Sequence, residues 1–181
     1  MKRILGAVAL ASAGTLFFVG QWVVQSAWTE PFSWADNNIS DLGEVSAPWH
    51  RLMNTVFVLN GALVATGAVT LFRGAVRYLL LAAAVGCVLV GLAPADVDEN
   101  THVLGAALVF VLGNLGLIAT RRRLGVVFGI VGLIATGLHV TGHGLGIGVA
   151  GMERVAVYPL FLWFLIEGVA RLRKNTVREG S

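Results

Sequence analysis

The chain has 181 residues, of which 56% are hydrophobic and 13% are charged, and its formal net charge is +3 at pH 7. Soluble domains carry about 25% charged residues, so this composition excludes an ordinary soluble enzyme, a disordered chain and a nucleic-acid-binding module. The single cysteine, Cys87, lies in an apolar run, which excludes a disulfide within the chain. The sequence therefore predicts an integral membrane protein.

Six apolar segments are long enough to cross a bilayer as helices. A hydrocarbon core of about 30 Å requires roughly 17–25 mostly apolar residues of helix. Short connections join the segments and no internal repeat is visible, so we expect one all-α domain over residues 1–181, a six-helix membrane bundle. Lys2 and Arg3 precede the first segment as in a signal peptide, but its apolar stretch is longer than such leaders carry, which predicts a retained helix. The expected spans cover about residues 4–28, 52–72, 78–95, 103–120, 124–141 and 154–170.

Basic residues gather at one end of this predicted bundle. Eleven of the thirteen Lys and Arg residues lie before the first span, after the last span, or in the connections after the second and fourth spans. Because positive residues remain on the cytoplasmic side, the pattern predicts cytoplasmic termini in the cell membrane, and it explains the basic charge without a nucleic-acid partner. Eight of the ten acidic residues and all four histidines lie at or beside the other, extracytoplasmic end, where we expect any chemistry.

The connection after the first span contains the polar sequence Asn38-Ile39-Ser40-Asp41-Leu42-Gly43. Asn, Ser and Asp beside Gly are typical of turns and helix caps, because their side chains bond nearby backbone N–H groups. In one interpretation Ser40 or Asp41 caps a short helix. In the other, Asp41 lies in a polar outer pocket, and both residues are candidates for catalysis.

Two arginines interrupt the acidic extracytoplasmic end. Arg51 opens the second span, and Arg154 opens the sixth beside Glu153. Salt bridges between loops, from these arginines to Asp41 or Asp96, are one interpretation. The other is a ligand-binding set of Arg51, Glu153 and Arg154 that holds the phosphate or carboxylate of a lipid.

The turn between the third and fourth spans brings an acid and an imidazole to the ends of two helices. Asp96 and His102 flank this turn, whereas Asp98 and Glu99 at its apex are typical of a solvated turn. A carboxylate and an imidazole at a water-accessible helix end are suited to acid–base catalysis or metal binding. The candidate catalytic residues are therefore Ser40, Asp41, Asp96 and His102.

The other histidines are candidate metal ligands. His139 and His143 share one helix face if the fifth span continues past Gly142, and His50 lies at the same end of the bundle. Zinc in a catalytic site takes three protein ligands and a water, so zinc is the cofactor that this set suggests; a hydrogen-bonded structural cluster is the alternative. If the helix ends converge, one pocket holds Asp41, His50, Asp96, His102, His139 and His143.

Few polar residues lie within the spans themselves. We expect Asn60 and Asn114 to face the bundle and bond another helix, and Glu167 to pair with Arg171 one turn on. Glycines 125, 129 and 132 predict a close-packing face on the fifth span. The sparse polar content at mid-membrane depth argues against a transporter.

Five segments together resemble a known family. Residues 38–43 are similar to the Ile-Ser-Asp-x-Gly element of the Frag/DRAM/Sfk membrane proteins, and the chain more closely resembles the prokaryotic domain-of-unknown-function family number 998. The other segments are residues 50–54, 91–96, 113–118 and 153–159. The resemblance implies a six-span helical fold and brings no established activity.

Three classes of function fit these features. The first is a lipid-modifying membrane hydrolase, in which a metal or an acid–base pair activates water at the extracytoplasmic face. The second is a protein that binds or transports a lipid or another amphiphile without chemistry. The third is a structural or partner subunit in the bilayer. The sequence specifies neither a substrate nor an oligomeric state.

Overall fold

The computed structural model describes the backbone of residues 1–179 and the side chains of residues 1–174, and these residues form helices and connections without a strand. Six helical stretches are long and apolar enough to cross a membrane. They are α1 (Lys2–Gln25), α2 (His50–Leu71), α3 (Gly74–Leu92), the stretch Glu99–Ala119, α6 (Arg123–Val140) and most of α7 (Val149–Glu179). The predicted all-α, six-span fold is therefore confirmed, and the chain is a multi-pass integral membrane protein.

The fourth span is built from three consecutive pieces. It consists of α4 (Glu99–Ala107), a π-helical segment η2 (Leu108–Gly113) and α5 (Asn114–Ala119). A π-helix shifts the register of the side chains that follow it, and such segments occur often at functional sites.

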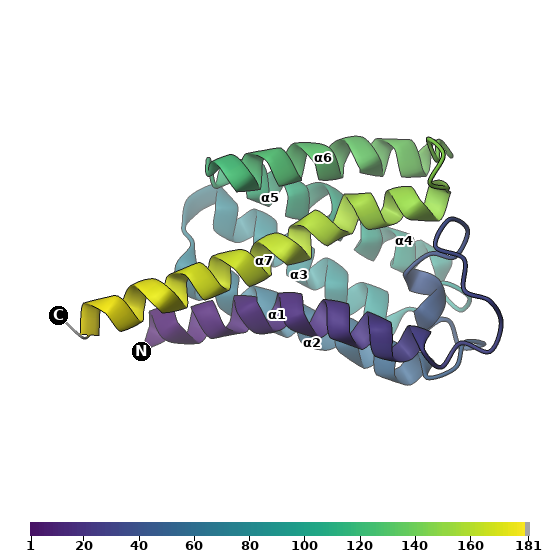
Figure 1. Cartoon of the computed structure of the whole chain (residues 1–181), viewed down its shortest axis with the longest axis horizontal. Coiled ribbons are helices and arrows are strands. Elements are labelled where there is room, and N and C mark those ends of the chain that lie inside the picture. Colours follow the sequence, from purple (N-terminus) through teal and green to yellow (C-terminus); the bar gives the residue numbers. More distant parts are fainter. Residues whose placement is uncertain (180–181) are drawn as a thin grey trace.

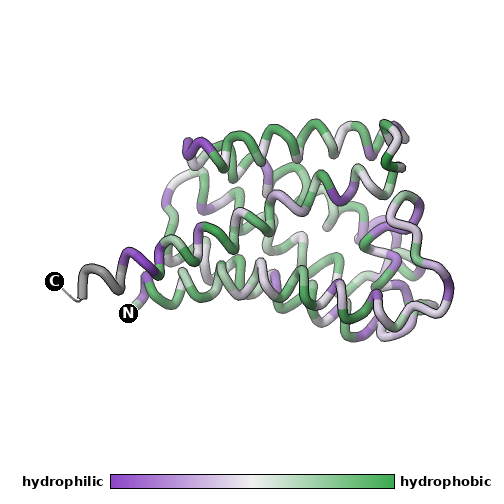
Figure 2. Tube along the Cα trace, in the orientation of Figure 1, coloured by the Kyte–Doolittle hydropathy of each residue, from purple (hydrophilic) through white to green (hydrophobic). Residues whose placement is uncertain are grey.

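The spans pack in chain order into a closed ring (Figure 1). Each span contacts the next one, and α7 returns to contact α1. Both termini lie at one end of the bundle in Figure 1. The connections 26–49, 93–98 and 141–148 lie at the opposite end, which is called the loop end below. Figure 2 shows apolar residues along the helices and hydrophilic residues gathered toward the two ends, as expected for spans in contact with lipid.

The helix boundaries differ from the expected spans by a few residues, and three of these differences affect the loop end. The first helix ends at Gln25, and Trp28 packs edge-on against Phe32 in the connection instead. The fourth span begins at Glu99, because the side chain of Asp98 accepts a hydrogen bond from the N–H of Thr101 and caps the helix. Hydrogen bonding to the Thr101 side chain, and next to the Thr101 backbone, lowers the pKa of Asp98. The sixth span begins at Val149, so residues expected at its entrance lie inside the helix.

Glycines allow the helix backbones to approach closely inside the ring. A Cβ atom added to Gly86 of α3 would lie 2.5 Å from the carbonyl oxygen of Gly105 in α4, and one added to Gly14 of α1 would lie 2.5 Å from that of Phe161 in α7. Neither position has room for a side chain. Close contact of small residues is the ordinary means of packing membrane helices, and here it draws together the spans that bound the ring interior.

The polar residues inside the spans behave largely as predicted. The Asn114 amide donates to the carbonyl oxygen of Ala156 at 3.0 Å and so joins the fourth span to α7, while Gly129 and Gly132 of the predicted glycine face of α6 pack against Asn114. Glu167 pairs with Arg171 as expected, and also with Arg122. Asn60 is fully buried, but neither of its amide atoms has a hydrogen-bond partner among the described residues.

Candidate functional site

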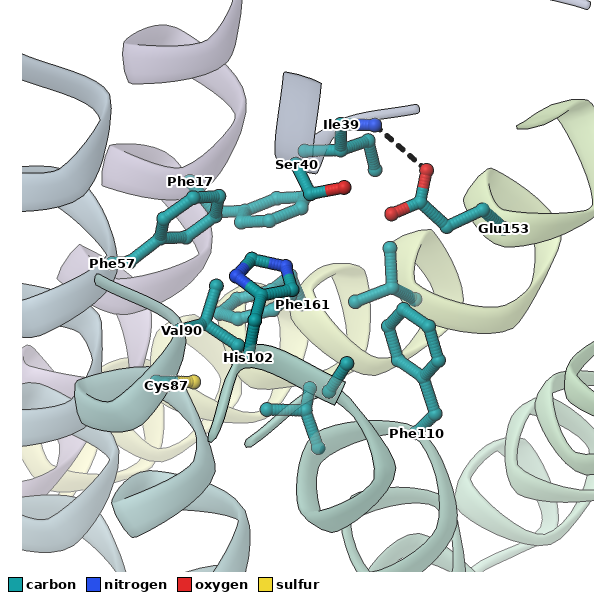
Figure 3. A pocket seen from close by; sticks show the side chains of 13 residues that line it. Phe17, Ile39, Ser40, Phe57, Cys87, Val90, His102, Phe110, Glu153 and Phe161 are labelled. Atoms are coloured by element: carbon teal, nitrogen blue, oxygen red, sulfur yellow. Dashed lines mark hydrogen bonds between the residues drawn. The ribbon is translucent and has the colours of Figure 1, made fainter. Parts of the chain in front are cut away.

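A cavity of about 50 Å³ lies inside the ring at the loop end (Figure 3). Most of its wall is apolar and comes from α1, α2, α3, the fourth span and α7. The π-helical segment η2 contributes Val109 and Phe110 to this wall. The remaining apolar and thiol-bearing residues are Phe17, Ile39, Phe57, Cys87, Val90, Ala106, Val157 and Phe161, and three polar residues complete the lining: Ser40, His102 and Glu153.

His102 is buried at the start of the fourth span with its ring turned into the cavity (Figure 3). Its Nδ1 lies 2.8 Å from the carbonyl oxygen of Ala93, the residue that ends α3. Because a carbonyl oxygen can only accept a hydrogen bond, Nδ1 carries the proton in the neutral ring. The other nitrogen, Nε2, is then a hydrogen-bond acceptor and a base.

Glu153 is a buried carboxylate, 5% exposed, on the second turn of α7. Its Oε2 accepts a hydrogen bond of 2.7 Å from the N–H of Ile39 in the connection after α1. The other carboxylate oxygen is turned toward the cavity (Figure 3). Glu153 therefore holds the connection in place and also offers an acceptor to the cavity.

Ser40 belongs to the short 3₁₀-helix η1 (Ser40–Gly43), which covers the cavity at the loop end. Ile39 and Leu42, on either side of it, are 3% and 0% exposed and insert into the bundle. The Ser40 hydroxyl points into the cavity, toward the space that His102 and Glu153 also face (Figure 3). Three polar groups distant in sequence thus meet in an otherwise apolar cavity.

Asp41 and Asp96, the other predicted catalytic residues, do not line this cavity. Asp41 Oδ2 accepts from the N–H of Asn38 at 2.9 Å and so stabilises the turn before η1, but neither Ser40 nor Asp41 caps this helix, whose N-cap is Ile39 without a side-chain hydrogen bond. Asp96 accepts from the N–H groups of Val45 and Ser46 at 3.1 and 3.4 Å and so joins two loops. Both carboxylates are engaged by backbone donors and serve the architecture of the loop end.

The loop-end acids act on one another electrostatically at Glu44, which follows η1. Burial is the largest cause that raises the pKa of Glu44, and the charges of Asp41 and Asp96 raise it further.

The three candidate metal ligands lie apart from the cavity and bond to neighbouring groups. Nδ1 of His50 lies 3.0 Å from the carbonyl oxygen of Ala47, and Nδ1 of His139 lies 2.9 Å from that of Val149. His143 is not on the helix face of His139, because α6 ends at Val140 and Gly142 takes a positive φ of 74°. The expected i, i+4 pair is therefore not formed.

No group of three or more His, Cys, Asp or Glu side chains among the described residues is placed to hold a metal ion. The residues present thus do not fit the zinc site that the histidines suggested. Of the six residues expected to share one pocket, His102 alone lines the cavity.

The two arginines of the loop end differ in their surroundings. Arg51 is exposed at the start of α2. Arg154 is 4% exposed, and its Nη1 donates to the carbonyl oxygens of Asn37, Ala150 and Trp34 at 2.8, 2.9 and 3.3 Å. The expected salt bridge to Asp41 or Asp96 is absent among the described side chains, and carbonyl groups take its place.

The sequence missed two features of the site. Glu153 was grouped with the arginines as a ligand-binding residue at a helix entrance, whereas it lies inside α7 and faces the ring interior. The insertion of Ile39 and Leu42 was also missed. These two apolar residues stand three positions apart in a polar loop, and this spacing was the signal in the sequence that could have indicated their insertion.

The five segments that carry the family resemblance meet at contacts around the site. Asn54 donates to the carbonyl oxygen of Gly43 at 2.9 Å, and a Cβ at Gly91 would lie 2.6 Å from the carbonyl oxygen of Asn54. Asn114 bonds α7, and Glu153 bonds Ile39. The resemblance therefore covers the framework that positions the cavity.

No curated protein and no solved structure shows significant similarity to the chain. A family model described as "Protein of unknown function (DUF998)" matches residues 12–170, most of the chain, and reaches all six spans. The chain therefore belongs to the DUF998 family of proteins of unknown function.

Proposed function

We propose that the protein binds a membrane amphiphile through its loop-end cavity, in the cell membrane and with the loop end on the extracytoplasmic side. The convergence of Ser40, His102 and Glu153 in an otherwise apolar cavity carries this proposal. Pockets that bind small molecules are mostly apolar with a few polar groups that fix the ligand's orientation. The distribution of basic residues supports the orientation in the membrane.

The chemistry of the polar groups indicates which end of a ligand they receive. Nε2 of His102 and the Glu153 oxygen that is turned toward the cavity are acceptors, and the Ser40 hydroxyl both donates and accepts. A buried carboxylate is costly unless hydrogen bonds satisfy it. The ligand therefore carries a hydroxyl or an amine, which donates to Glu153 and His102.

The volume of the cavity limits how much of the ligand enters. A cavity of about 50 Å³ holds a few water molecules or a small polar group. The polar end of the amphiphile and its first carbons occupy the cavity against the aromatic wall, and the rest of its chain remains in the bilayer.

Hydrolysis of a lipid ester is a second candidate function, and the orientation of His102 favours it. With Nδ1 bonded to Ala93, Nε2 can accept the proton of Ser40 as the hydroxyl oxygen attacks the ester carbonyl carbon, and can return that proton to the leaving alkoxide. Water then hydrolyses the acyl-serine. The two side chains are not hydrogen-bonded to each other, so this step needs a closer approach when the substrate is bound.

The binding proposal is tested with amphiphiles of equal chain length that differ in their polar end. A long-chain amine, an alcohol and a fatty acid are added to protein in lipid nanodiscs, each below its micelle-forming concentration, and thermal unfolding is followed. We expect the amine and the alcohol to stabilise the wild type and the fatty acid not to. Glu153→Gln should weaken amine binding roughly 10- to 100-fold, because hydrogen bonds to charged groups contribute about 1.5–3 kcal/mol. Glu99→Gln, an exposed acid at the same end, is the matched control; equal responses to all three amphiphiles would contradict the proposal.

The hydrolase candidate is tested with a fluorophosphonate probe that labels activated serines. Labelling of the wild type that Ser40→Ala and His102→Ala abolish would support it, and Ser26→Ala at the end of α1 is the control. Unlabelled wild-type protein that still binds the amine or the alcohol leaves binding as the function.

A further inference from the structure

A hollow with a basic wall lies at the end of the bundle where both termini lie (Figure 1). This end is called the terminus end below. The hollow is bounded by the start of α1, the end of α2, the start of α3 and α7, and its volume of about 870 Å³ is within the range of ligand pockets. Half of the described residues around it are basic and none is acidic. The basic residues are Lys2, Arg3, Arg73, Arg77 and Arg171. This hollow is called the basic pocket below.

Two of these basic side chains are held in place by the protein. Nε and Nη2 of Arg77 donate to the carbonyl oxygens of Phe72 and Val69, both at 3.0 Å, and so satisfy the last turn of α2. Nη1 of Arg77 is unbonded and is not buried. Arg171 pairs with Glu167, and its guanidinium carbon lies 5.0 Å from the centroid of the Phe72 ring. A ligand that meets groups already fixed in this way pays less entropy to order them.

Most of the positive charge in the basic pocket has no acidic partner. Lys2, Arg3 and Arg73 are exposed, and their side chains make no hydrogen bond or ion pair with another described residue. The one acidic side chain that the structure describes in this half of the bundle, Glu167, already pairs with two arginines. The pocket therefore presents accessible donors and uncompensated positive charge to a ligand.

The orientation of the protein in the membrane does not explain why these residues surround one hollow. The positive-inside pattern depends on the number of basic residues on one side of the membrane, not on a shared pocket. Arg121 and Arg123, in and after the connection before α6, are exposed at the same end and do not line the pocket. They contribute to the pattern equally well and so provide a natural control.

We propose that the basic pocket binds the headgroup of one anionic phospholipid in the leaflet at the terminus end. The phosphate oxygens accept hydrogen bonds from Arg3, Arg73 and the unbonded Nη1 of Arg77. Arginine suits this role because its planar fork matches two oxygens of one phosphate. Basic pockets between helix ends at a membrane surface are suited to such headgroups.

The apolar part of the wall favours a lipid over a soluble phosphate. Leu5 of α1 and Val69 of α2 line the pocket and are 57% and 47% exposed. Leu5 follows Arg3 by two positions and Val69 precedes Arg73 by four, so both lie on the bilayer side of the charges. An acyl chain that runs from the headgroup into the bilayer contacts these two side chains, and a soluble phosphate cannot. The pocket is at the opposite end of the bundle from the loop-end cavity, so this proposal does not depend on the proposed function.

The test measures which lipids stay bound to the purified full-length protein. Protein from nanodiscs containing equal amounts of phosphatidylglycerol and phosphatidylcholine is transferred to detergent, and native mass spectrometry counts the retained lipids. Each Lys or Arg beside anionic lipid contributes about a fivefold preference. We therefore expect one phosphatidylglycerol per chain, retained at least about tenfold over phosphatidylcholine. Millimolar inorganic phosphate should not displace it.

A pair of double variants tests whether the pocket, and not the charge of the terminus end, holds the lipid. Arg3→Gln combined with Arg73→Gln removes two charges from the pocket and should lower the preference for phosphatidylglycerol at least about fivefold. Arg121→Gln combined with Arg123→Gln removes two charges from the same end outside the pocket and should keep the wild-type preference.

A second pair of variants fills space without changing charge. Val69→Trp places a large side chain in the wall of the pocket, and Val127→Trp places it at another exposed position, on α6. We expect Val69→Trp to lose the bound phosphatidylglycerol and Val127→Trp to keep it, which decides the question even if the loss of two basic residues disturbs insertion. The proposal is overturned by equal retention of the two lipids, by displacement with phosphate alone, by equal losses in the two arginine variants, or by retention in Val69→Trp.

Discussion

Removal of the Glu153 carboxylate should release the segment that covers the cavity. In Glu153→Ala the N–H of Ile39 loses the acceptor that lies 2.7 Å away. A hydrogen bond to a charged group contributes about 1.5–3 kcal/mol, and each 1.4 kcal/mol changes an equilibrium about tenfold. The local opening of residues 36–42 should therefore become roughly 10- to 100-fold more frequent, while the ring itself stays packed.

Hydrogen–deuterium exchange of the Ile39 amide measures this opening directly, because exchange reports the free energy of local unfolding. Glu153→Gln retains a neutral acceptor and should show a smaller increase, since such a bond contributes about 0.5–1.5 kcal/mol. Glu99→Ala controls for loss of a loop-end acid. The reasoning fails if Ile39 exchanges in Glu153→Ala at the wild-type rate, or if amides of the whole bundle accelerate together.

Three further predictions concern stability and topology. The raised pKa of Glu44 means that its stabilising contribution is complete below the unfolded-state pKa and is lost as pH rises through the folded-state pKa; Glu44→Gln should therefore lose less stability than the wild type when thermal unfolding is compared between acidic and neutral pH. Asn114→Ala removes the hydrogen bond between the fourth span and α7 and should lower the free energy of unfolding by about 1–2 kcal/mol, as measured by denaturant unfolding. An unchanged free energy of unfolding would show that this hydrogen bond does not stabilise the fold. Reporter fusions after Gly43 and Ser181 should lie on opposite sides of the membrane, and a shared side would contradict the expected topology.

The fold was predictable because span length and helix number follow directly from the apolar runs. Ser40 and His102, two of the candidate catalytic residues, line one cavity, although the sequence did not group these two residues in one pocket. Their neighbours were harder to place, because side chains near a turn can bond the backbone beside them instead of facing a cavity. Asp41 does so at Asn38, whereas Asp96 bonds the backbone of Val45 in another connection.

The backbone conformation at Gly142 separates two of the three histidines that were predicted to bind a metal ion. His139 and His143 would lie on one face of a continuous helix, but the positive φ of Gly142 turns the chain between them. Glycine commonly ends helices in this way, yet a glycine within or beside an apolar run does not show by itself where the helix stops. Likewise, the earlier start of α7 moved Glu153 from the entrance of a helix to its interior.

Because α7 closes the ring against α1, the loop end has an order of assembly. Ile39 and its acceptor Glu153 are separated by 114 positions in the chain, and a ribosome adds about 5–20 residues per second. For roughly 6–23 s after its own synthesis, the connection after α1 has neither Glu153 nor Arg154 to hold it. A nascent chain with five spans therefore exposes an unclosed interior, and the last helix to be inserted completes both the ring and its cover.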